Sequence, residues 1–309
     1  MAKITPLKEV QRDINSVVTV GTFDGVHEGH RAIMDTLVRQ AKARNGRSVV
    51  VTFNPHPRTI IHSKSDGIKL LTTLRERAEV LNYIGVDELV VIPFTRDFSL
   101  LSSEEFVKDI IYSKIGISEF VIGFDHHFGK DRSGTIETLQ KLGPVLGFDV
   151  SVVSKKEMGE TTISSTVIRK EISEIGDMNR SAALLGRYYM LNALVIHGDE
   201  RGRTIGFPTA NLQPEHPDKA LPKNGIYAVK IRVDDVWYNG MMNIGVRPTF
   251  DGHTKSLEVN IFDFDEMIYG KMVQIRFFDR IRDEQKFKGL DGLKKQLKLD
   301  KEAAELILS

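Results

Sequence analysis

Cysteine is absent from the 309 residues of the chain. This absence excludes a disulfide framework, a cysteine-ligated zinc site, an iron–sulfur cluster and a thiol nucleophile. An excess of one charge sign is also missing, because 43 lysines and arginines stand against 42 acidic residues. Such a balance leaves no electrostatic footprint for bulk nucleic-acid or membrane binding, so local groups must meet any anionic substrate.

Long apolar runs are missing as well. Runs such as residues 89–94 are far too short for a membrane span, and the first ten residues lack the apolar core of a signal peptide. We therefore expect a cytoplasmic protein. The composition is otherwise that of a globular chain, with 41% apolar and 28% charged residues. A length of 309 residues favours two domains.

The first half of the chain alternates apolar strands with helical segments. Strands are expected at residues 16–21, 47–53, 88–94, 119–124 and 148–154. The helical spacing of apolar residues between them predicts helices at residues 30–44, 73–84, 102–114 and 134–142. Strands that alternate with helices in this way predict βαβ units and a parallel sheet.

The pattern changes around residues 175–186, a small, polar and helical segment that suits a connector. Beyond it, apolar strands follow one another through short turns that leave little room for helices. Five or six such strands predict an antiparallel barrel. The tail from Asp283 is expected to form a helix that packs on its own domain through Phe287, Leu290, Leu293 and Leu297. We expect domains at residues 1–180 and 183–309.

The segment after the first expected strand contains two histidines. Gly21 permits a tight turn, and His27 and His30 share a face if a helix begins near them. Helix-start N–H groups beside imidazoles make a good phosphate site. Taken alone, the histidines could also bind a metal ion or satisfy hydrogen bonds of the turn.

This segment, GTFDGVHEGH at residues 21–30, resembles the HxGH signature of the nucleotidylyltransferase superfamily in its flavin-specific version. Three further motifs resemble the same family and follow its order along the chain: FNPHP at 53–57, GFDHHFG at 123–129 and ISSTVIR at 163–169. The resemblance implies a Rossmann-like doubly wound sheet and transfer of AMP from ATP without a covalent enzyme intermediate.

The same resemblance implies roles for single residues. His27, His30 and Arg169 are the expected catalytic residues, which stabilise the ATP phosphates. Further residues expected at these phosphates are Gly21, Phe23, Asp24, Gly25, Ser165 and Thr166. Residues expected at the flavin are Asn54, Pro55, His56, Asp125 and Phe128, and the family often has Asn at position 125. By themselves, Ser165 and Thr166 are also typical of a helix N-cap.

The second half contains a glycine-rich segment, HGDERGRTIGFPTANL, at residues 197–212. It is not a Walker A sequence, because no Gly-Lys-Ser/Thr follows the glycines. Its GFPTAN portion resembles the riboflavin kinase family, which implies Thr209 and Asn211 as ligands of the magnesium of Mg–ATP. Gly202, Arg203 and Gly206 are expected at the ATP phosphates.

Downstream motifs extend the riboflavin kinase resemblance. In SLEVNIFDFD, Glu258 corresponds to the family's catalytic base, which takes the proton of a weakly acidic alcohol. Two residues later, Asn260 stands where relatives commonly carry His. In NIGVRPTF, Arg247 is expected at the flavin, and a structural role is equally consistent with the sequence.

The two resemblances run from about residue 16 to about residue 297, in the order of the bacterial bifunctional riboflavin kinase/FAD synthetases. They imply phosphorylation of riboflavin to FMN by the second domain and adenylylation of FMN to FAD by the first. ATP is then a co-substrate and Mg²⁺ the metal, while riboflavin, FMN and FAD are substrates or products. The expected partners are small molecules, without nucleic acid or membrane, and the oligomeric state is left open. A single-activity enzyme with one decayed half and a non-catalytic flavin-binding regulator are the alternatives.

Overall fold

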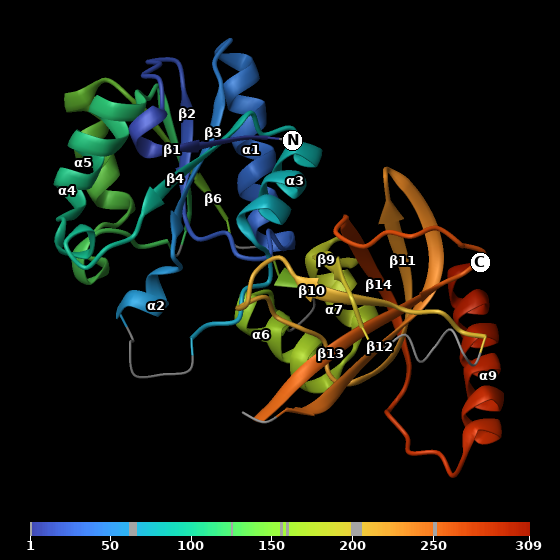
Figure 1. The fold of residues 1–309 in the computed structure, drawn as a ribbon. Coiled ribbons are helices and arrows are strands. Elements are labelled where there is room, and N and C mark those ends of the chain that lie inside the picture. The colour runs from blue at the N-terminus through green and yellow to red at the C-terminus, as the bar shows by residue number, and fades with distance from the viewer. Residues whose placement is uncertain are drawn as a thin grey trace. The chain divides into compact units, whose positions relative to one another are not determined.

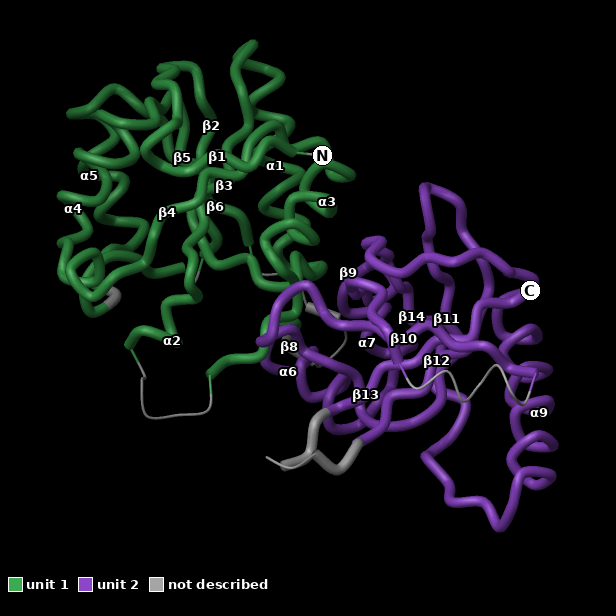
Figure 2. The backbone as a smooth tube through the Cα atoms, viewed as in Figure 1, with its two compact units in different colours: residues 1–164 green, residues 165–309 purple. Residues whose placement is uncertain are grey.

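The computed structural model describes residues 2–61, 67–124, 126–154, 157–158, 161–198, 206–249 and 252–309. The chain forms two compact units, residues 1–164 and residues 165–309, drawn in green and purple in Figure 2. We call them the first and the second unit and describe each by itself. No helix of the described residues is long and apolar enough to cross a membrane.

The first unit is built on a sheet of six strands in the order β1-β4-β3-β2-β5-β6. Every pairing in this sheet is parallel, which confirms the predicted parallel sheet. Its strands are β1 (Lys3–Pro6), β2 (Val17–Val20), β3 (Ser48–Asn54), β4 (Glu88–Pro93), β5 (Glu119–Gly123) and β6 (Asp149–Val153).

Helices cover both faces of this sheet (Figure 1). One face carries α1 (Glu28–Ala43) and α3 (Leu74–Ile84), and the other carries α4 (Ser103–Glu105), the π-helical segment η3 (Phe106–Ile115) that continues it, and α5 (Ile136–Leu146). Shorter elements of this unit are η1 (Leu7–Glu9), α2 (Pro57–Ile61), η2 (Phe98–Leu100), η4 (Lys130–Arg132), β7 (Glu157–Met158) and β8 (Thr161–Thr162).

Capping fixes where two of these helices begin. Thr73 accepts a hydrogen bond from the N–H of Glu76, whose carboxylate accepts one from the N–H of Thr73, so α3 starts directly after Thr73. Ser102 and Glu105 form the same reciprocal pair before α4, and the bonds from the Ser102 hydroxyl and N–H lower the pKa of Glu105.

Apolar side chains from the strands pack against the helices to form the core of the first unit. The predicted apolar face of α1 is confirmed, because Met34, Leu37, Val38 and Ala41 are buried. On the opposite face, Phe106, Val107, Ile111 and Ile115 of η3 pack in one cluster with strand residues. The sheet is therefore buried on both sides, as parallel sheets require.

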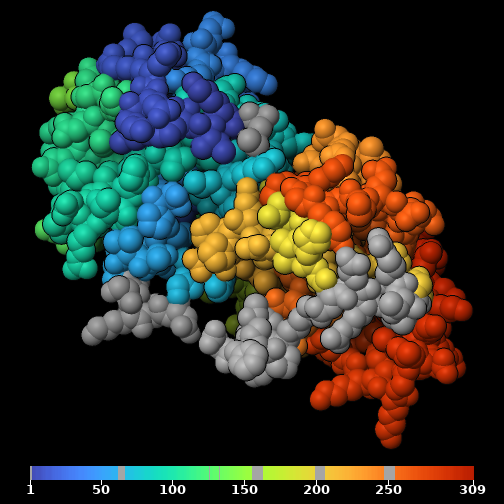
Figure 3. Space-filling model, viewed as in Figure 1, coloured from blue at the N-terminus to red at the C-terminus, as the bar shows by residue number. Residues whose placement is uncertain are grey.

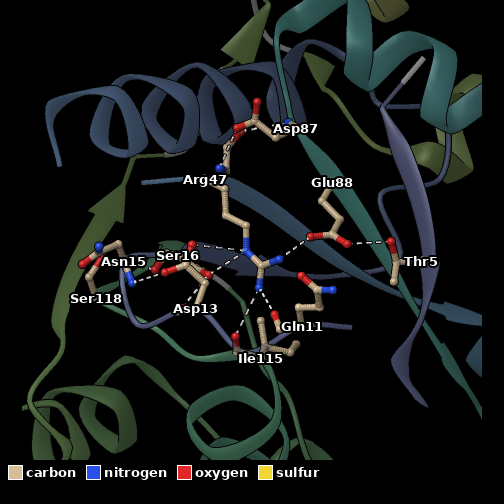
Figure 4. Close-up of polar contacts among 11 residues, drawn as sticks. Thr5, Gln11, Asp13, Asn15, Ser16, Arg47, Asp87, Glu88, Ile115 and Ser118 are labelled. Atoms are coloured by element: carbon tan, nitrogen blue, oxygen red, sulfur yellow. Dashed lines mark hydrogen bonds and ion pairs between the residues drawn. The ribbon is translucent and has the colours of Figure 1, made fainter. Parts of the chain in front are cut away.

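The amino ends of the parallel strands are tied by a polar network around Arg47 (Figure 4). The Arg47 guanidinium donates to Glu88 Oε2 at 2.7 Å, to Ser16 Oγ at 2.9 Å and to the carbonyl of Gln11 at 2.5 Å. Glu88 also accepts from Thr5 of β1. This network lies at the edge of the sheet opposite the carboxyl ends of the strands. Open α/β sheets bind ligands at the carboxyl ends, so the role of this network is to hold the amino ends of the strands together.

A second group of ion pairs, around Arg44, lies at the same edge of the sheet. Arg44 donates to Asp149 Oδ2 at 2.6 Å and to Glu119 Oε2 at 2.7 Å. The bonds to Asp149 and Glu119 raise the pKa of Arg44. Asp149 and Glu119 begin β6 and β5, so one guanidinium joins two neighbouring strand ends.

The second unit begins with helical segments, and β9 follows them. These are α6 (Ser165–Lys170), η5 (Glu171–Ile175) and α7 (Met178–Leu185). Asp177 accepts the N–H of Arg180 and so starts α7, while Gly186, in the left-handed conformation, ends it. The predicted helical connector thus includes α7, which contacts the barrel strands β9 (Tyr189–Ile196) and β14 (Met272–Arg282).

Six antiparallel strands close the barrel of the second unit in the order β10-β13-β12-β11-β14-β9. The antiparallel barrel predicted from the sequence is confirmed. Its strands are β9 (Tyr189–Ile196), β10 (Ala210–Pro214), β11 (Gly225–Val233), β12 (Val236–Thr249), β13 (Gly252–Ile261) and β14 (Met272–Arg282). The last two residues of the PTAN motif, Ala210 and Asn211, begin β10, so this part of the motif belongs to the barrel wall.

The chain ends in α9 (Leu290–Leu308), shown in red at the surface of the second unit in Figures 1 and 3. The predicted terminal helix is confirmed, but its start is later than expected, because Phe287 precedes it. The expected contact residue Leu290 is 63% exposed. The docked face lies further along, where Leu297, Ala304 and Leu308 pack with Met241 and Phe262 of the barrel unit.

Candidate active sites

A loop of unusual backbone conformation joins β2 to α1. Phe23, Gly25 and Val26 have φ angles of 44°, 89° and 41°. For non-glycine residues such angles are strained and persist only when the surroundings fix them. The phenyl ring of Phe23 folds over Gly21, where an added Cβ would lie 2.9 Å from it. Gly21 therefore allows the loop to turn back on itself directly after the strand.

The two motif histidines lie side by side at the start of α1. His27 is the N-cap residue, and His30 belongs to the first turn. Their rings are stacked, with centroids 3.7 Å apart and an interplanar angle of 20°, and the edge of Phe23 meets the His30 ring at 5.2 Å. The predicted shared face is thus present, at a helix N-terminus whose dipole favours a bound anion.

Gly29 makes this stack possible. A Cβ added at Gly29 would lie 3.3 Å from Cε1 and from Nδ1 of the His27 ring. This is tighter than ordinary van der Waals contact, so a side chain here would press against the imidazole. The glycine of the HxGH signature thus makes room for one of its histidines.

The expected flavin residues of the FNPHP motif lie at the carboxyl end of β3. Asn54 is the last residue of the strand and is exposed, as is Pro55, while His56 is half-buried. The Nδ1 atom of His56 accepts the N–H of Arg58 at 3.2 Å, which fixes its ring at the start of α2. These residues therefore share the sheet edge from which the histidine loop also departs.

An aromatic cluster lies at the same sheet edge. Phe53 contacts Phe94 and Phe98 at centroid distances of 5.5 and 5.8 Å, and Phe98 contacts Phe106 at 6.0 Å. Phe128, expected at the flavin, continues the series at 6.1 Å from Phe106. Phe128 is only 7% exposed and belongs to the core cluster, so its main contacts in this structure are other side chains of the core.

Asp24 is fully buried beneath the histidine loop. Its carboxylate accepts the N–H groups of Leu71 and Thr72 at 3.1 and 3.0 Å. The hydroxyl of Thr72 in turn accepts the N–H of Gly25 at 3.0 Å. Asp24 thus anchors the loop to the segment that precedes α3.

The closing motif of the first resemblance lies on α6, in the second unit. Ser165 and Thr166 form its first turn and Arg169 its last. The expected meeting of these residues with His27 and His30 stays a prediction. Three further expected residues, Asp125, Gly202 and Arg203, lie outside the described part of the chain.

The barrel brings the expected kinase residues together. Asn211 of β10 is the cross-strand partner of Glu258 on β13. The Thr209 hydroxyl donates to Glu258 Oε2 at 3.5 Å. Directly opposed residues of antiparallel strands place their side chains on the same face, so Thr209, Asn211 and Glu258 form one cluster. Glu258 is 47 residues from Asn211 and 49 from Thr209 in the sequence, so only the barrel brings it to them.

Two contacts hold the PTAN segment in place. The Asn260 side chain, 7% exposed, donates to the carbonyl of Pro208 at 2.6 Å. Gly198 lies against Asn211, where an added Cβ would be 1.9 Å from Nδ2. Asn260 and Glu258 are two residues apart on one strand and so face the same side. Asn260 therefore holds the motif through its side-chain amide.

The oxygen donors of this cluster suit a hard cation. Hydroxyl, amide and carboxylate oxygens of Thr209, Asn211 and Glu258 are the ligand types that Mg²⁺ takes in proteins. Within the described residues there is no group of three or more His, Asp or Glu that could hold a metal ion. Gly206 is exposed with a φ of 82°, and Arg247 lies on β12 opposite Thr254, its side chain outside the described atoms.

Several residues in or beside these sites were not predicted from the sequence. Thr72 and Arg77 lie under the histidine loop, although they are about 50 residues away from it in the sequence. Asn243 of β12 is opposite Glu258 on its other side. Cross-strand register could have indicated Asn243, because NIGVRPTF and SLEVNIFDFD form consecutive strands. Nothing local marks Thr72 or Arg77.

Comparison with known proteins matches each half of the chain to a protein family. Residues 9–167 match the family model of FAD synthetase, and residues 185–308 match that of riboflavin kinase. A bifunctional riboflavin kinase/FMN adenylyltransferase of Listeria monocytogenes is 40% identical over 94% of this chain and 91% of its own length. The chain belongs to this bifunctional family.

Other members of the riboflavin kinase/FMN adenylyltransferase family agree. The Bacillus subtilis protein is 37% identical over 96% of this chain and 93% of its own length. The Escherichia coli protein is 36% identical over 92% of this chain and 90% of its own length. A crystal structure titled macrolide-efflux protein, from Streptococcus pneumoniae, is 34% identical over 98% of both chains with a TM-score of 0.87. That solved structure has the same fold over nearly the full chain.

Proposed function

We propose that the chain makes FMN from riboflavin in the second unit and FAD from FMN in the first, with ATP as co-substrate of both reactions. The observation that carries the proposal is the cluster of Thr209, Asn211 and Glu258 in the barrel wall. Family membership supports both activities, and the closeness of these three side chains supports a kinase site in the barrel.

In the kinase reaction, Glu258 is the proposed general base. Its carboxylate takes the proton of the terminal hydroxyl of riboflavin, whose oxygen then attacks the γ-phosphorus of ATP while ADP leaves. A general base contributes about 10²- to 10⁴-fold to such a step. The 3.5 Å contact between Glu258 and Thr209 supports this role, because it places the carboxylate beside the residues proposed to hold Mg–ATP.

Magnesium is the metal we propose for the kinase site. Thr209 and Asn211 would hold it through neutral oxygens, and the bound ion would neutralise charge on the phosphates. Neutral donors suit a cation that the phosphates of ATP already partly neutralise. Gly202, Arg203 and Gly206 are proposed for the phosphates and Arg247 for the flavin.

In the adenylylation reaction, two phosphates react without a protein nucleophile. A phosphate oxygen of FMN attacks the α-phosphorus of ATP, and pyrophosphate leaves. His27 and His30, stacked at the N-terminus of α1, are proposed to stabilise the phosphates together with Ser165, Thr166 and Arg169. Gly21, Phe23 and Gly25 shape the phosphate-facing loop, and Asp24 acts through the backbone it holds.

The flavin of FMN is proposed to lie at the carboxyl edge of the sheet. Asn54, Pro55 and His56 end β3 there, and Asp125 and Phe128 follow β5. The exposure of Asn54 and Pro55 supports contact with a ligand, since their side chains are not used in the core. Ligands of open α/β sheets bind at this edge.

The domain boundary is also a proposal. We place it between residues 180 and 183, within the segment that lies between the two family matches. Grouping by contacts instead divides the chain after residue 164. We further propose that the enzyme works in the cytoplasm on small molecules, because ATP and flavins are cytoplasmic metabolites.

A pair of incubations tests the proposal. The purified chain is mixed with ATP, magnesium and either riboflavin or, in a parallel sample, FMN, and the flavins are separated over time. We expect FMN first and FAD later, and neither when EDTA exceeds the magnesium. FMN alone would indicate a single-activity enzyme, and so would FAD formed only from supplied FMN. Unchanged riboflavin and FMN would indicate a flavin-binding regulator.

A further inference from the structure

A buried ion pair lies beneath the loop that carries the histidines. Arg77 of α3 is 4% exposed, and its Nη2 lies 3.8 Å from Oδ1 of the fully buried Asp24. Burial lowers the pKa of Arg77, and the charges of Asp24 and Glu76 oppose that effect. Burying a charge costs free energy unless the charge is paired and hydrogen-bonded, so a buried arginine at this position needs an explanation.

The guanidinium of Arg77 reaches the start of the loop. Its Nη1 donates to the Thr52 hydroxyl at 2.8 Å, and that hydroxyl donates to the carbonyl of Thr22 at 3.2 Å. Its Nη2 also donates to the carbonyl of Thr72 at 3.4 Å. One side chain of α3 thus joins the end of β3, the segment before α3 and the first loop residue.

Thr72 reaches the middle of the same loop. Its hydroxyl accepts the N–H of Gly25 at 3.0 Å and donates to Asp24 Oδ1 at 3.3 Å. Its N–H donates to the same carboxylate at 3.0 Å. These bonds lie between Phe23 and Val26, the two non-glycine residues of this loop with positive φ. Strained residues of this kind keep their conformation only where the surroundings over-determine it.

We propose that Arg77 and Thr72 are positioning residues for FMN adenylylation, which fix the strained loop and thereby the His27–His30 pair. The proposal rests on the proposed function of the first unit. His27 directly follows Val26, so a change in the loop backbone moves the N-cap of α1 and the ring stacked on His30. Both residues act through Asp24 and the loop backbone.

The test uses the full chain with the variants Thr72→Val and Thr72→Ser. Valine keeps the shape of threonine and removes the hydroxyl, whereas serine keeps the hydroxyl. We expect Thr72→Val to lower kcat for FAD formation from FMN about tenfold, with KM for ATP within about twofold, since small misplacements cost rate. Thr72→Ser should restore most of the rate, and riboflavin phosphorylation should be unchanged in both.

Arg77→Lys is the second variant, with Arg75→Lys as its control. Arg75 is on the same helix, is half-exposed and pairs with Glu79 at 3.7 Å. Lysine keeps the charge and loses the planar fork that holds two partners. We expect Arg77→Lys to behave as Thr72→Val does, and Arg75→Lys to match the unchanged chain.

Histidine NMR spectra of the full chain, assigned with His27→Gln and His30→Gln, give a readout that does not depend on activity. We expect Thr72→Val and Arg77→Lys to shift the signals of His27 and His30, and Thr72→Ser to restore them. Unshifted signals with unchanged kcat and a lowered unfolding midpoint would overturn the proposal and leave a purely structural pair. If the unchanged chain makes no FAD, the proposed function fails, and the spectra still decide whether these residues position the histidines.

Discussion

Two glycines make room for side chains of the two proposed sites. Gly29 lies under the ring of His27, and Gly198 lies against the amide of Asn211. Neither has a positive φ, so backbone strain does not require glycine at either position. At both positions an added Cβ would meet the side chain of a proposed site residue. Substitution by alanine therefore tests the role of that side chain.

Gly29→Ala should lower FAD formation while leaving the fold intact. The added Cβ would press on the His27 ring from 3.3 Å, whereas alanine is favoured over glycine inside a helix by about 1 kcal/mol. We expect an unfolding midpoint at or above that of the unchanged chain and a fall of roughly threefold to tenfold in the FMN-to-FAD rate. Gly67→Ala, which meets nothing within 4 Å, is the control. Equal FAD rates in the two variants would show that a Cβ pressing on the His27 ring does not slow FAD formation.

Gly198→Ala should damage the kinase reaction instead. Its Cβ would overlap Asn211 Nδ2, so the amide must move away from the cluster with Glu258. We expect riboflavin phosphorylation to fall about tenfold or more with a raised KM for Mg–ATP. Gly292→Ala, in open space on α9, should leave both activities unchanged. A normal KM for Mg–ATP in Gly198→Ala would argue against Asn211 as a ligand.

Residue-scale prediction from sequence succeeded where a motif is local. The stacked histidines are three residues apart, so helical geometry alone gives their shared face. The pairing of Thr209 with Glu258 needs the barrel register, which the sequence pattern does not specify. The contacts of Thr72 and Arg77 depend on how α3 packs, and no sequence spacing encodes that.

Among the elements, α9 illustrates how a polar residue can set the docking of a helix. Asp300 is 1% exposed, and its two oxygens accept from Nε and Nη2 of Arg282 at 2.8 and 2.6 Å. Gln296 donates to the same carboxylate at 2.9 Å. Bidentate pairs of this kind fix orientation as well as contact. The helix is therefore held to the end of β14 by an ion pair beside its apolar face.

Asp300→Ala should destabilise the second unit strongly. It leaves the Arg282 guanidinium, 15% exposed, without its carboxylate, and breaking such a pair costs about 3 kcal/mol. Glu305→Ala, which removes an exposed pair with Lys301, should change stability by less than about 0.5 kcal/mol. Trp237 is the only tryptophan and lies in β12, so its fluorescence during denaturation reports this unit alone. Equal midpoints for the two variants would contradict the account of α9.

Element prediction failed mainly at edges and ends. The four residues of β1 pair with β4 alone, and so short a segment shows no clear apolar alternation. In the tail, the apolar spacing of Phe287, Leu290, Leu293 and Leu297 suggested an earlier docked stripe. In the structure, Leu297 of that stripe packs together with Ala304 and Leu308. The buried Asp300 lies beside them, a polar residue that an apolar pattern cannot indicate.

At the scale of the whole molecule, the segment of residues 168–184 belongs to neither family match, yet its last helix contacts the barrel. Lys223 donates its N–H to the carbonyl of Ile172 at 2.9 Å, and Arg180 pairs with Glu171 at 2.9 Å. Met178 is fully buried. Part of the connector therefore stabilises the second unit although the kinase motifs lie beyond it.

Two fragments test where the kinase begins. A fragment from Ala183 keeps the kinase motifs and should fold and make FMN. A fragment from Ser165 adds η5 and α7, and we expect it to unfold at a higher denaturant concentration, followed by Trp237 fluorescence. An unfolded Ala183 fragment beside an active Ser165 fragment would place the boundary near residue 165.

The central claim is that the Glu258 site carries out phosphorylation and the His27–His30 site adenylylation, and a crossed measurement of two variants tests it most directly. Initial rates of riboflavin phosphorylation and of FAD formation from supplied FMN are measured for Glu258→Gln and His30→Ala in the full chain. Glu258→Gln should lose roughly 10²-fold or more in phosphorylation and keep FAD formation, because glutamine cannot accept the proton. His30→Ala should convert riboflavin to FMN and stop there, since we expect two sites without shared residues to act independently. If either variant, still folded, lost both activities equally, the assignment of one reaction to each site would be wrong.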